Sequence, residues 1–598
     1  MGQVSEVVLS RNNLDKSSSP YLLQHTANPI FWQEWSDDLM KYAAEKRKLL
    51  FVSVGYSTCH WCHVMAAEAF SDDKTARYLN EHFICIKIDR EQRPDIDQFL
   101  MDFINRQNGR GGWPLNVFMT PDLSPVFALT YAPEVSRNSM RSFLSVAEKI
   151  LEYFEANRDK IPPFESIENK PDQANEQSLT ETLSKYYDAD NGGFGNGQKF
   201  PPHSSLLFLL YQLGIKDNPL IKTICVKTLD AIMMRGLNDH LQGGIFRYCI
   251  DNEWTIPHFE KMLYDQAMAL WYYSLAYKVL GNEVYKLMAE KILKCLDECF
   301  KNDGLYIAGH DADTDHEEGL TYLWSYGQLE KELLPEEFSK LTAAYYLNTS
   351  GNFEGLNHLL RKNNTPLNDI EDRLLHIRMK RKQPSKDTKI ISGLNALVAI
   401  AMIQAGRNLE KSELEEKAGE LVHSILDRFY VEKTLGHSYF NGVMQKQSFL
   451  FDSAALLTAI SMLCENDNSW SNLMTEMTLC VEKFKEDGKW IESYPEDFPK
   501  VYASWLDHPI PSSVSMAEMG LTRVALLRGK ETDMKQYREP FQSDFYNITA
   551  MMTNGLFHIY TSEKFIPWNL LPANSLQVRG KHQQDCFGGT CRPLDLNI

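Results

Sequence analysis

The chain has no long apolar run, and this absence excludes a membrane-spanning helix. Nowhere among its 598 residues do 18 apolar residues follow one another. The first residues include no stretch apolar enough for a signal peptide, and Glu6 stands where a myristoylation motif needs Ser or Thr. We therefore expect a cytoplasmic protein that has no membrane partner.

Positive charge is also scarce. The sequence holds 62 Lys and Arg against 80 Asp and Glu, a formal net charge of -18. Nucleic acids and anionic membrane surfaces are bound by clustered Lys and Arg, so we expect neither as a partner.

Cysteines are few for the length of the chain, and most stand in apolar, helix-like contexts. There are eleven, an odd number, and examples are Cys225, Cys295 and Cys480. This usage is typical of a reducing compartment rather than of a disulfide framework. A chain of 598 residues also exceeds what one hydrophobic core usually supports, so two or more domains are expected.

The most informative motif is the segment from Tyr56 to His63, Tyr-Ser-Thr-Cys-His-Trp-Cys-His. It follows an apolar run, 49–54, and leads into a helix-like segment, 64–70. A strand that feeds a Cys-x-x-Cys at the start of a helix places the first thiol, Cys59, near unpaired helix amides, which favour the thiolate. We predict a redox pair in which Cys59 attacks and Cys62 resolves.

Two other interpretations of this motif stay open. Cys59, His60, Cys62 and His63 are all residue types that bind zinc, but no second Cys-x-x-Cys or His cluster lies nearby to complete a tetrahedral site. The pair could also be inert. We expect no metal and no cofactor.

The following residues fit a thioredoxin-like domain. An alternating β-rich run spans 83–89, a helix is expected over 95–107, a hairpin over 115–129 and a closing helix over 137–158. In thioredoxin-like folds an X-Pro bond just before that hairpin is cis and faces the CxxC motif, and Trp113-Pro114 is the candidate. One departure is Ser53, where thioredoxins often bury a proton-shuttling Asp.

After Arg158 the pattern changes. A polar, aperiodic stretch, 166–177, marks a linker, and long amphipathic helices separated by Gly-rich and Pro-rich turns follow it. Several helices begin with polar residues and continue into small apolar ones, as at 258–267, 391–397 and 451–457. We predict an α/α toroid, a closed ring of helical hairpins whose inner helices start around one common mouth.

Two segments, 242–265 and 310–324, supply this mouth with polar side chains. Paired carboxylates can carry general acid-base chemistry, and a Trp face suits a sugar. Ligand binding without turnover and plain helix capping are the alternatives. The candidate catalytic residues are His258, Glu260, Asp311 and Asp313, and the candidate substrate-binding residues are Trp113, Pro114, Arg247, Asp251, Trp254 and Asp265.

Several motifs together resemble one family. They include Ser18-Ser-Pro-Tyr-Leu-Leu-Gln-His25, Gly55 to Met65, Ile88-Asp-Arg-Glu91, Gly111-Gly-Trp-Pro-Leu115 and Pro257 to Asp265. Over nearly the whole chain the sequence resembles the spermatogenesis-associated protein 20 family of thioredoxin-domain proteins.

The resemblance implies a multidomain α/β plus all-α fold. A thioredoxin-like domain is expected over 1–165, a linker over 166–178 and an (α/α)6 toroid, similar to six-hairpin glycosidases and N-acylglucosamine 2-epimerases, over 179–598. The resemblance does not supply a reaction.

Three functions are compatible with these residues. The first is a thiol-disulfide oxidoreductase acting on a protein thiol or disulfide, with Cys586 and Cys591 as a hypothetical internal exchange partner. The second is an epimerase, isomerase or hydrolase that acts on a small carbohydrate in the toroid mouth. The third is a non-catalytic binding or scaffold protein.

Overall fold

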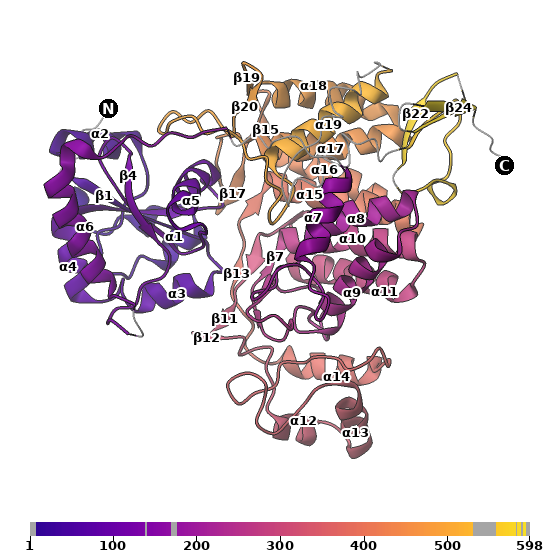
Figure 1. Ribbon diagram of the computed structural model, residues 1–598, viewed down its shortest axis with the longest axis horizontal. Helices are drawn as coiled ribbons and strands as arrows, with labels where there is room; N and C mark the ends of the chain where they lie inside the picture. The colour runs from indigo at the N-terminus through magenta and orange to yellow at the C-terminus, as the bar shows by residue number, and fades with distance from the viewer. Residues whose placement is uncertain are drawn as a thin grey trace.

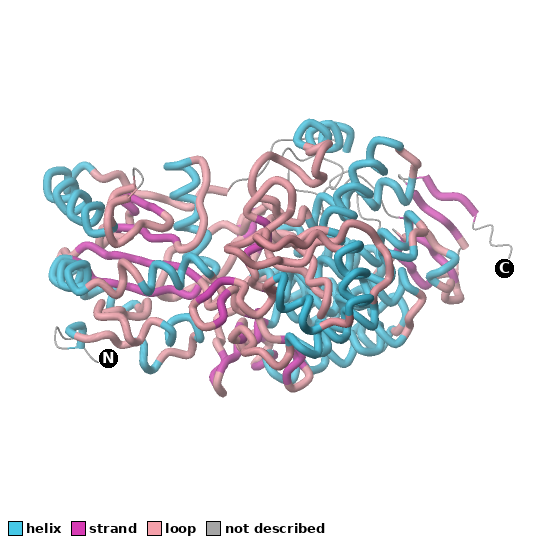
Figure 2. Tube along the Cα trace, turned by 90° about the horizontal axis from the view of Figure 1, so that it is seen from below, coloured by secondary structure: helices cyan, strands magenta, loops and turns pink. Residues whose placement is uncertain are grey.

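The molecule consists of an α/β domain at one end, a helical domain in the middle and a small sheet at the far end (Figures 1 and 2). The computed structural model describes residues 8–137, 140–168, 176–529, 558–573, 575–581, 583–587 and 590–593. Among these residues, no helix is long and apolar enough to cross a membrane.

The first domain is built on a four-stranded sheet in the order β2-β1-β3-β4. The central strand β1 pairs in parallel with β2 and antiparallel with β3. Every residue of β1 is buried, because helices cover both faces of the sheet. The elements are α1 (Pro20–Gln24), α2 (Asp37–Lys46), β1 (Leu49–Gly55), α3 (His60–Ala67), α4 (Asp73–His82), β2 (Phe83–Asp89), α5 (Pro94–Asn108), β3 (Leu115–Met119), β4 (Pro125–Leu129) and α6 (Phe143–Asn157).

The two faces of this sheet have separate cores, since successive side chains of a strand point to opposite sides. Phe51 and Phe118 pack with Phe143 of α6 on one face. Leu50 and Val52 pack with residues of α2 and α5 on the other. This arrangement is the predicted thioredoxin-like domain, with one correction: helix α6 begins at Phe143 rather than Arg137, because the Ser142 hydroxyl caps it by accepting the Ser145 amide at 3.4 Å.

The second domain alternates buried inner helices with amphipathic outer ones. Helices α8, α10, α15, α17 and α19 pack side by side in that order. All 18 residues of α15 are buried, as expected of a helix that is surrounded on every side. The inner helices are α8 (His203–Ile215), α10 (Leu263–Leu280), α15 (Ser392–Leu409), α17 (Leu450–Asn466) and α19 (Ser513–Leu527), and the outer ones α7 (Glu176–Tyr186), α9 (Pro219–Met234), α11 (Glu283–Cys295), α16 (Glu413–Phe429) and α18 (Ser471–Glu482).

This succession of helical hairpins is the predicted α/α toroid, so the expected fold class, a thioredoxin-like domain followed by a toroid, is confirmed. The described residues supply five hairpins. The part of the six-hairpin prediction that falls on 530–557 lies outside the described residues.

Short strands and loops precede the inner helices and face the first domain (Figure 1). We call residues 247–262, 309–318 and 386–391 the toroid rim. Here β13, β10 and β7 form a small sheet. The sequence favoured a helix from Pro257 onward, but Pro257–His258 is strand β6 and α10 begins only at Leu263. His258 and Glu260 are therefore presented by extended backbone.

The remaining strands of the toroid domain are short and mostly close hairpins between helices. They are β5 (Tyr248–Cys249), β7 (Lys261–Met262), β8 (Lys301–Asn302), β9 (Leu305–Tyr306), β10 (Gly309–His310), β11 (Asp313–Thr314), β12 (Glu317–Glu318), β13 (Lys386–Asp387), β14 (Ile390–Ile391), β15 (Tyr430–Val431), β16 (Thr434–Leu435), β17 (Ser438–Phe440), β18 (Val443–Met444), β19 (Lys485–Glu486) and β20 (Lys489–Trp490).

Two further parts were not anticipated from the sequence. Helices α12 (Tyr326–Glu332), α13 (Pro335–Ala344) and α14 (Asn368–Arg378) form an excursion with its own small core. A C-terminal sheet has the order β22-β21-β23-β24, made of β21 (His558–Ser562), β22 (Ser575–Arg579), β23 (Gln584–Phe587) and β24 (Thr590–Pro593).

Candidate functional site

The cysteine pair lies at the start of helix α3, directly after strand β1. Cys59 is the N-cap residue and forms a disulfide with Cys62. The Cys62 amide donates a hydrogen bond to Cys59 Sγ at 3.2 Å. A sulfur in this position faces the positive end of the helix dipole, which favours a thiolate once the disulfide opens. The strand-CxxC-helix arrangement is the one that the sequence predicts.

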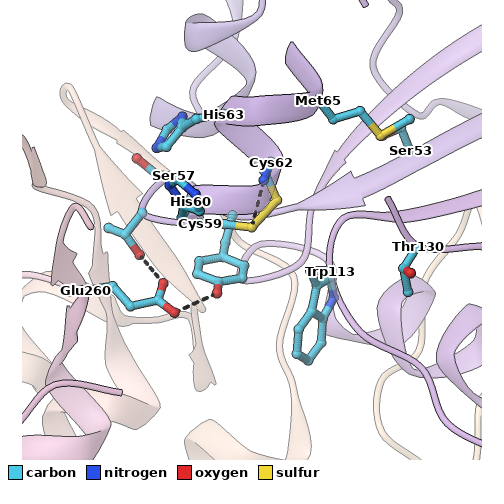
Figure 3. The surroundings of a disulfide bond; sticks show 12 residues. Ser53, Ser57, Cys59, His60, Cys62, His63, Met65, Trp113, Thr130 and Glu260 are labelled. Carbon is cyan, nitrogen blue, oxygen red and sulfur yellow. Dashed lines mark hydrogen bonds between the residues drawn. A yellow bond between two sulfur atoms is a disulfide. The ribbon is translucent and has the colours of Figure 1, made fainter. Parts of the chain in front are cut away.

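The predicted proline loop also lies at this place. The Trp113-Pro114 bond is cis, as expected, and Figure 3 shows Trp113 beside the disulfide. The Trp113 ring is held by a hydrogen bond from Nε1 to Asp97 Oδ1 at 2.7 Å and by the Arg90 guanidinium, 3.7 Å from the ring centroid.

The toroid rim covers the turn that carries the cysteines. Tyr56 and Thr58 each donate a hydrogen bond to Glu260, at 3.1 and 3.4 Å. Figure 3 shows Glu260 below the turn that carries Cys59. The Ala312 amide reaches the Thr58 carbonyl at 3.4 Å. As a result Cys59 is only 3% exposed and Cys62 2%. The sequence suggested two separate sites, one in each domain, and the structure brings them together at one boundary.

The histidines of the motif pair with carboxylates of the rim. His60 Nδ1 lies 2.8 Å from Asp313 Oδ1, and His63 Nε2 lies 2.9 Å from Asp311 Oδ1. Burial opposes protonation of both rings, but these hydrogen bonds and the neighbouring carboxylate charges outweigh it and raise both pKa values. The described residues contain no group of three or more His, Cys, Asp or Glu side chains that could hold a metal ion.

His258 joins the same cluster from the rim. Its ring stacks on that of His60 at a centroid distance of 5.6 Å, and its Nδ1 is hydrogen-bonded to Glu318. Glu318 was not among the candidates predicted from the sequence, and neither was the pairing of His60 and His63 with the rim. Each of the two histidines directly follows a cysteine. This alternation at a helix start was a signal that the histidines share the surroundings of the cysteine pair.

Glu260 is the acid at the centre of this boundary. It forms an ion pair with Arg247 at 3.1 Å, and Arg247 also donates a hydrogen bond to Tyr56. Burial raises the pKa of Glu260 to about 7, because it opposes ionisation more than the charges of Arg247 and His258 favour it. A carboxyl group with this pKa can accept or release a proton near neutral pH.

The remaining substrate-binding candidates have structural contacts. Asp251 accepts the amides of Thr255 and Ile256, both at 2.8 Å, and so holds a turn. Trp254 is fully buried, and its indole is closed off from ligands in this structure. Asp265 lies in the first turn of helix α10 and pairs with His203 at 2.9 Å.

Behind the disulfide, the expected departure from thioredoxins is present. Ser53 is buried in β1 and accepts a hydrogen bond from Lys87 Nζ at 3.0 Å. Lys87 is fully enclosed, and burial lowers its pKa well below the ordinary value.

A second buried cluster joins the domains near the CxxC turn. Lys389 of the rim lies 2.8 Å from Asp89 and from Glu91 of the first domain, and 3.1 Å from Asp387 of the rim. Asp89 and Glu91 belong to the segment Ile88-Asp-Arg-Glu91, one of the motifs that resemble the family. Asp89 and Glu91 therefore link the first domain to the toroid rim through Lys389.

Together, the fold and the site define a two-domain protein in which a thioredoxin-like CxxC motif is covered by the rim of an α/α toroid. A family model described as Thioredox_DsbH, protein of unknown function DUF255, matches residues 11–169. Relatives that are 30% and 35% identical match this chain, the first of them over 88% of its length, and the chain belongs to the spermatogenesis-associated protein 20 family.

Two relatives match this chain over different shares of its length. The uncharacterized protein B0495.5 of Caenorhabditis elegans is 30% identical over 601 residues, which cover 88% of this chain and 82% of that protein. Mouse spermatogenesis-associated protein 20 is 35% identical over 353 residues, covering 54% of this chain and 45% of the mouse protein.

Among solved structures, a sugar epimerase from a ruminal bacterium covers 59% of this chain and 97% of its own, with 14% identity and a TM-score of 0.31. A family 76 mannosidase of Bacteroides thetaiotaomicron covers 63% and 96%, with 9% identity and a TM-score of 0.38.

Proposed function

We propose that this protein is a thiol-disulfide oxidoreductase whose Cys59–Cys62 pair exchanges with a thiol or disulfide substrate. The observation that carries the proposal is the position of Cys59 at the N-cap of α3, where its sulfur accepts the Cys62 amide at 3.2 Å. Helix amides stabilise a thiolate at this position and make it a good nucleophile and leaving group.

The toroid rim covers the Cys59–Cys62 pair and limits which substrates can reach it. Cys59 is 3% exposed, and Thr58 beside it contacts the toroid rim. A small thiol needs less room than a protein, so we propose that small thiols reach Cys59 directly. A protein substrate would need the rim to move aside. In either case the rim supplies specificity, and the setting we expect is the reducing cytoplasm.

A redox titration tests this proposal. The protein is equilibrated in glutathione buffers of graded potential, its thiols are blocked, and the state of each pair is read by mass spectrometry of peptides. We expect a reversible transition for Cys59–Cys62 that disappears in Cys59→Ser and Cys62→Ser and persists in Cys586→Ser. A pair that never forms or never opens over the whole range would contradict the proposal.

A second candidate is a carbohydrate ligand in the toroid mouth. It is favoured by buried polar atoms at inner helix starts that have no hydrogen-bond partner among the described residues, namely Tyr264 Oη, Asp265 Oδ2 and Ser453 Oγ. Such atoms are costly unless something pairs with them. With Glu260 as the acid-base group, a sugar would satisfy both observations.

Binding measurements separate this candidate from the first. A panel of mono- and disaccharides is titrated into the protein by calorimetry, and we expect saturable binding that Asp265→Asn weakens. The absence of binding would exclude it, and the absence of both binding and exchange would leave a scaffold role.

A further inference from the structure

A buried tyrosine hydroxyl without a partner lies beside the second cysteine. Tyr21 of α1 is fully buried, and its hydroxyl makes no hydrogen bond among the described residues. The ring is fixed in place by an edge contact with His25, 4.9 Å between centroids, and by Lys87, whose Nζ lies 5.2 Å from the ring centroid.

Gly55 shows how close this hydroxyl is to the disulfide. A methyl carbon placed on Gly55 would lie 2.7 Å from Tyr21 Cζ, closer still to Tyr21 Oη, and 2.8 Å from Cys62 Sγ. The tyrosine hydroxyl and the Cys62 sulfur therefore share the space over one glycine, where any other residue would collide with both.

We propose that Tyr21 donates a hydrogen bond to the Cys62 sulfur as the disulfide opens. This role rests on the proposed function. A thiolate from solution attacks Cys59 Sγ, a bond forms between the two sulfurs, and the bond between Cys59 and Cys62 breaks. The electron pair of that bond stays on Cys62 Sγ, where the Tyr21 hydroxyl meets the developing charge.

Protons and electrons are balanced when a dithiol reductant is the only other reactant. The proton released when the attacking thiol ionised is returned through solvent to Cys62. When the attacking thiolate belongs to a dithiol, its second thiolate attacks the reductant sulfur in the mixed disulfide, and the bond from that sulfur to Cys59 Sγ breaks. Cys59 takes up, through solvent, the proton lost by the second thiol. The reductant leaves as a cyclic disulfide, and both cysteines are reduced.

The neighbouring Ser53 is already engaged, which explains why the Tyr21 hydroxyl stabilises the charge on the Cys62 sulfur. Ser53 occupies the strand position at which thioredoxins often bury an Asp, and it is already engaged by Lys87 at 3.0 Å. Burial and the charge of Asp89 raise the pKa of Tyr21 well above its ordinary value, so the hydroxyl keeps its proton and remains a donor.

The test compares Tyr21→Phe with Tyr272→Phe. Tyr272, in the middle of α10, is an equally buried tyrosine whose hydroxyl also has no partner among the described residues. The rate constant for reduction of Cys59–Cys62 by dithiothreitol is measured by quenching and mass spectrometry, and the stability of the oxidised form by urea unfolding.

We expect Tyr21→Phe to slow reduction by about tenfold or more, the worth of one hydrogen bond to a charged group, while Tyr272→Phe leaves the rate unchanged. The stability of oxidised Tyr21→Phe should not fall, because the lost hydroxyl has no partner in that state. A rate within twofold of the parent, or a slower rate together with lost stability, would overturn the role of Tyr21 and leave the proposed function standing. Absence of reduction in the parent protein would overturn the proposed function and this role with it.

Discussion

The two disulfides of this molecule have similar spacing and opposite surroundings. Cys59–Cys62 begins a helix under the cover of the toroid rim, whereas Cys586–Cys591 joins directly opposed residues of β23 and β24 at the far end of the molecule (Figure 1). Cys591 is exposed and Cys586 half-buried. Docking of the tail pair onto Cys59, which the sequence suggested, is not observed.

The two S–S bonds differ in what surrounds them. The pair Cys586–Cys591, which we call the hairpin pair, cross-links two neighbouring antiparallel strands and fixes their local geometry. The helix pair has an amide aimed at its sulfur, a proline loop beside it and titratable groups from a second domain around it. Removing those surroundings should make the first pair behave like the second.

The largest effect is expected from Lys389→Met. The substitution leaves Asp89, Glu91 and Asp387 buried together without their cation, and loss of one partner from a buried ion cluster costs about 3–5 kcal/mol. Urea unfolding should show this loss. Cys59 should also become open to bulky thiol reagents after reduction, as Cys591 already is.

Lys500→Met is the matched control, since Lys500 pairs with Glu486 at the surface, at 2.7 Å. Such pairs contribute about 0–1 kcal/mol. Equal effects of the two substitutions would show that the buried cluster does not hold the domains together.

The next effect concerns access to the two pairs. A dithiol coupled to a large dextran should reduce Cys586–Cys591 about as readily as free dithiothreitol does, but should reduce Cys59–Cys62 about a hundredfold more slowly if opening of the rim costs about 3 kcal/mol. Quenched samples analysed by peptide mass spectrometry give both rates in one experiment. Equal slowing at both pairs would mean that the rim is no barrier.

The cover over the helix pair should also depend on pH. The raised pKa values of His60 and His63 contribute stability below about pH 6.5, the ordinary value, that is lost as pH rises through the folded-state values. Glu260, with a pKa of about 7, stabilises the fold in its neutral form and loses this contribution as pH rises through 7.

Unfolding between pH 5 and pH 8 measures this dependence. Glu260→Gln keeps the shape of the neutral carboxyl and cannot ionise, so it should remove about 2 kcal/mol of the loss seen in the parent protein over that range. The hairpin pair, far from these groups, is the internal reference for access. An unchanged pH dependence in the variant would show that Glu260 is already ionised at pH 5.

Much of the thioredoxin-like domain could be predicted from the sequence, because its signals are local. The apolar run before Cys59 specifies a strand, the CxxC motif specifies a helix start, and Trp113-Pro114 specifies a turn. Each of these signals lies within a few residues. The helices that begin with polar residues and continue into small apolar ones likewise predicted the toroid.

The junction between the domains could not be predicted in this way. Glu260 meets Tyr56, and Asp313 meets His60, across about 200 or more residues of sequence, and no local pattern records such a pairing. The extended backbone at His258 was missed for a related reason. Pro257 looks like a helix start, but the pairing of Pro257–His258 with Tyr248–Cys249 keeps the segment as a strand.

The smallest effect, and the finest test of the contrast, comes from Thr58→Val. Valine has nearly the shape of threonine and lacks only the hydroxyl, which lies 3.4 Å from a Glu260 carboxylate oxygen and 3.2 Å from Met262 Sδ. The substitution therefore removes the weak hydrogen bonding of this hydroxyl across the junction. We expect a loss of about 0.5–1 kcal/mol in unfolding and a small rise in the access of bulky reagents to Cys59. Combined with Glu260→Gln, the effects should fall short of additivity, since both substitutions act on the same contact. Strict additivity would mean that the hydroxyl and the carboxyl act independently, and the cover over the helix pair would then depend on the buried cation and the histidines alone.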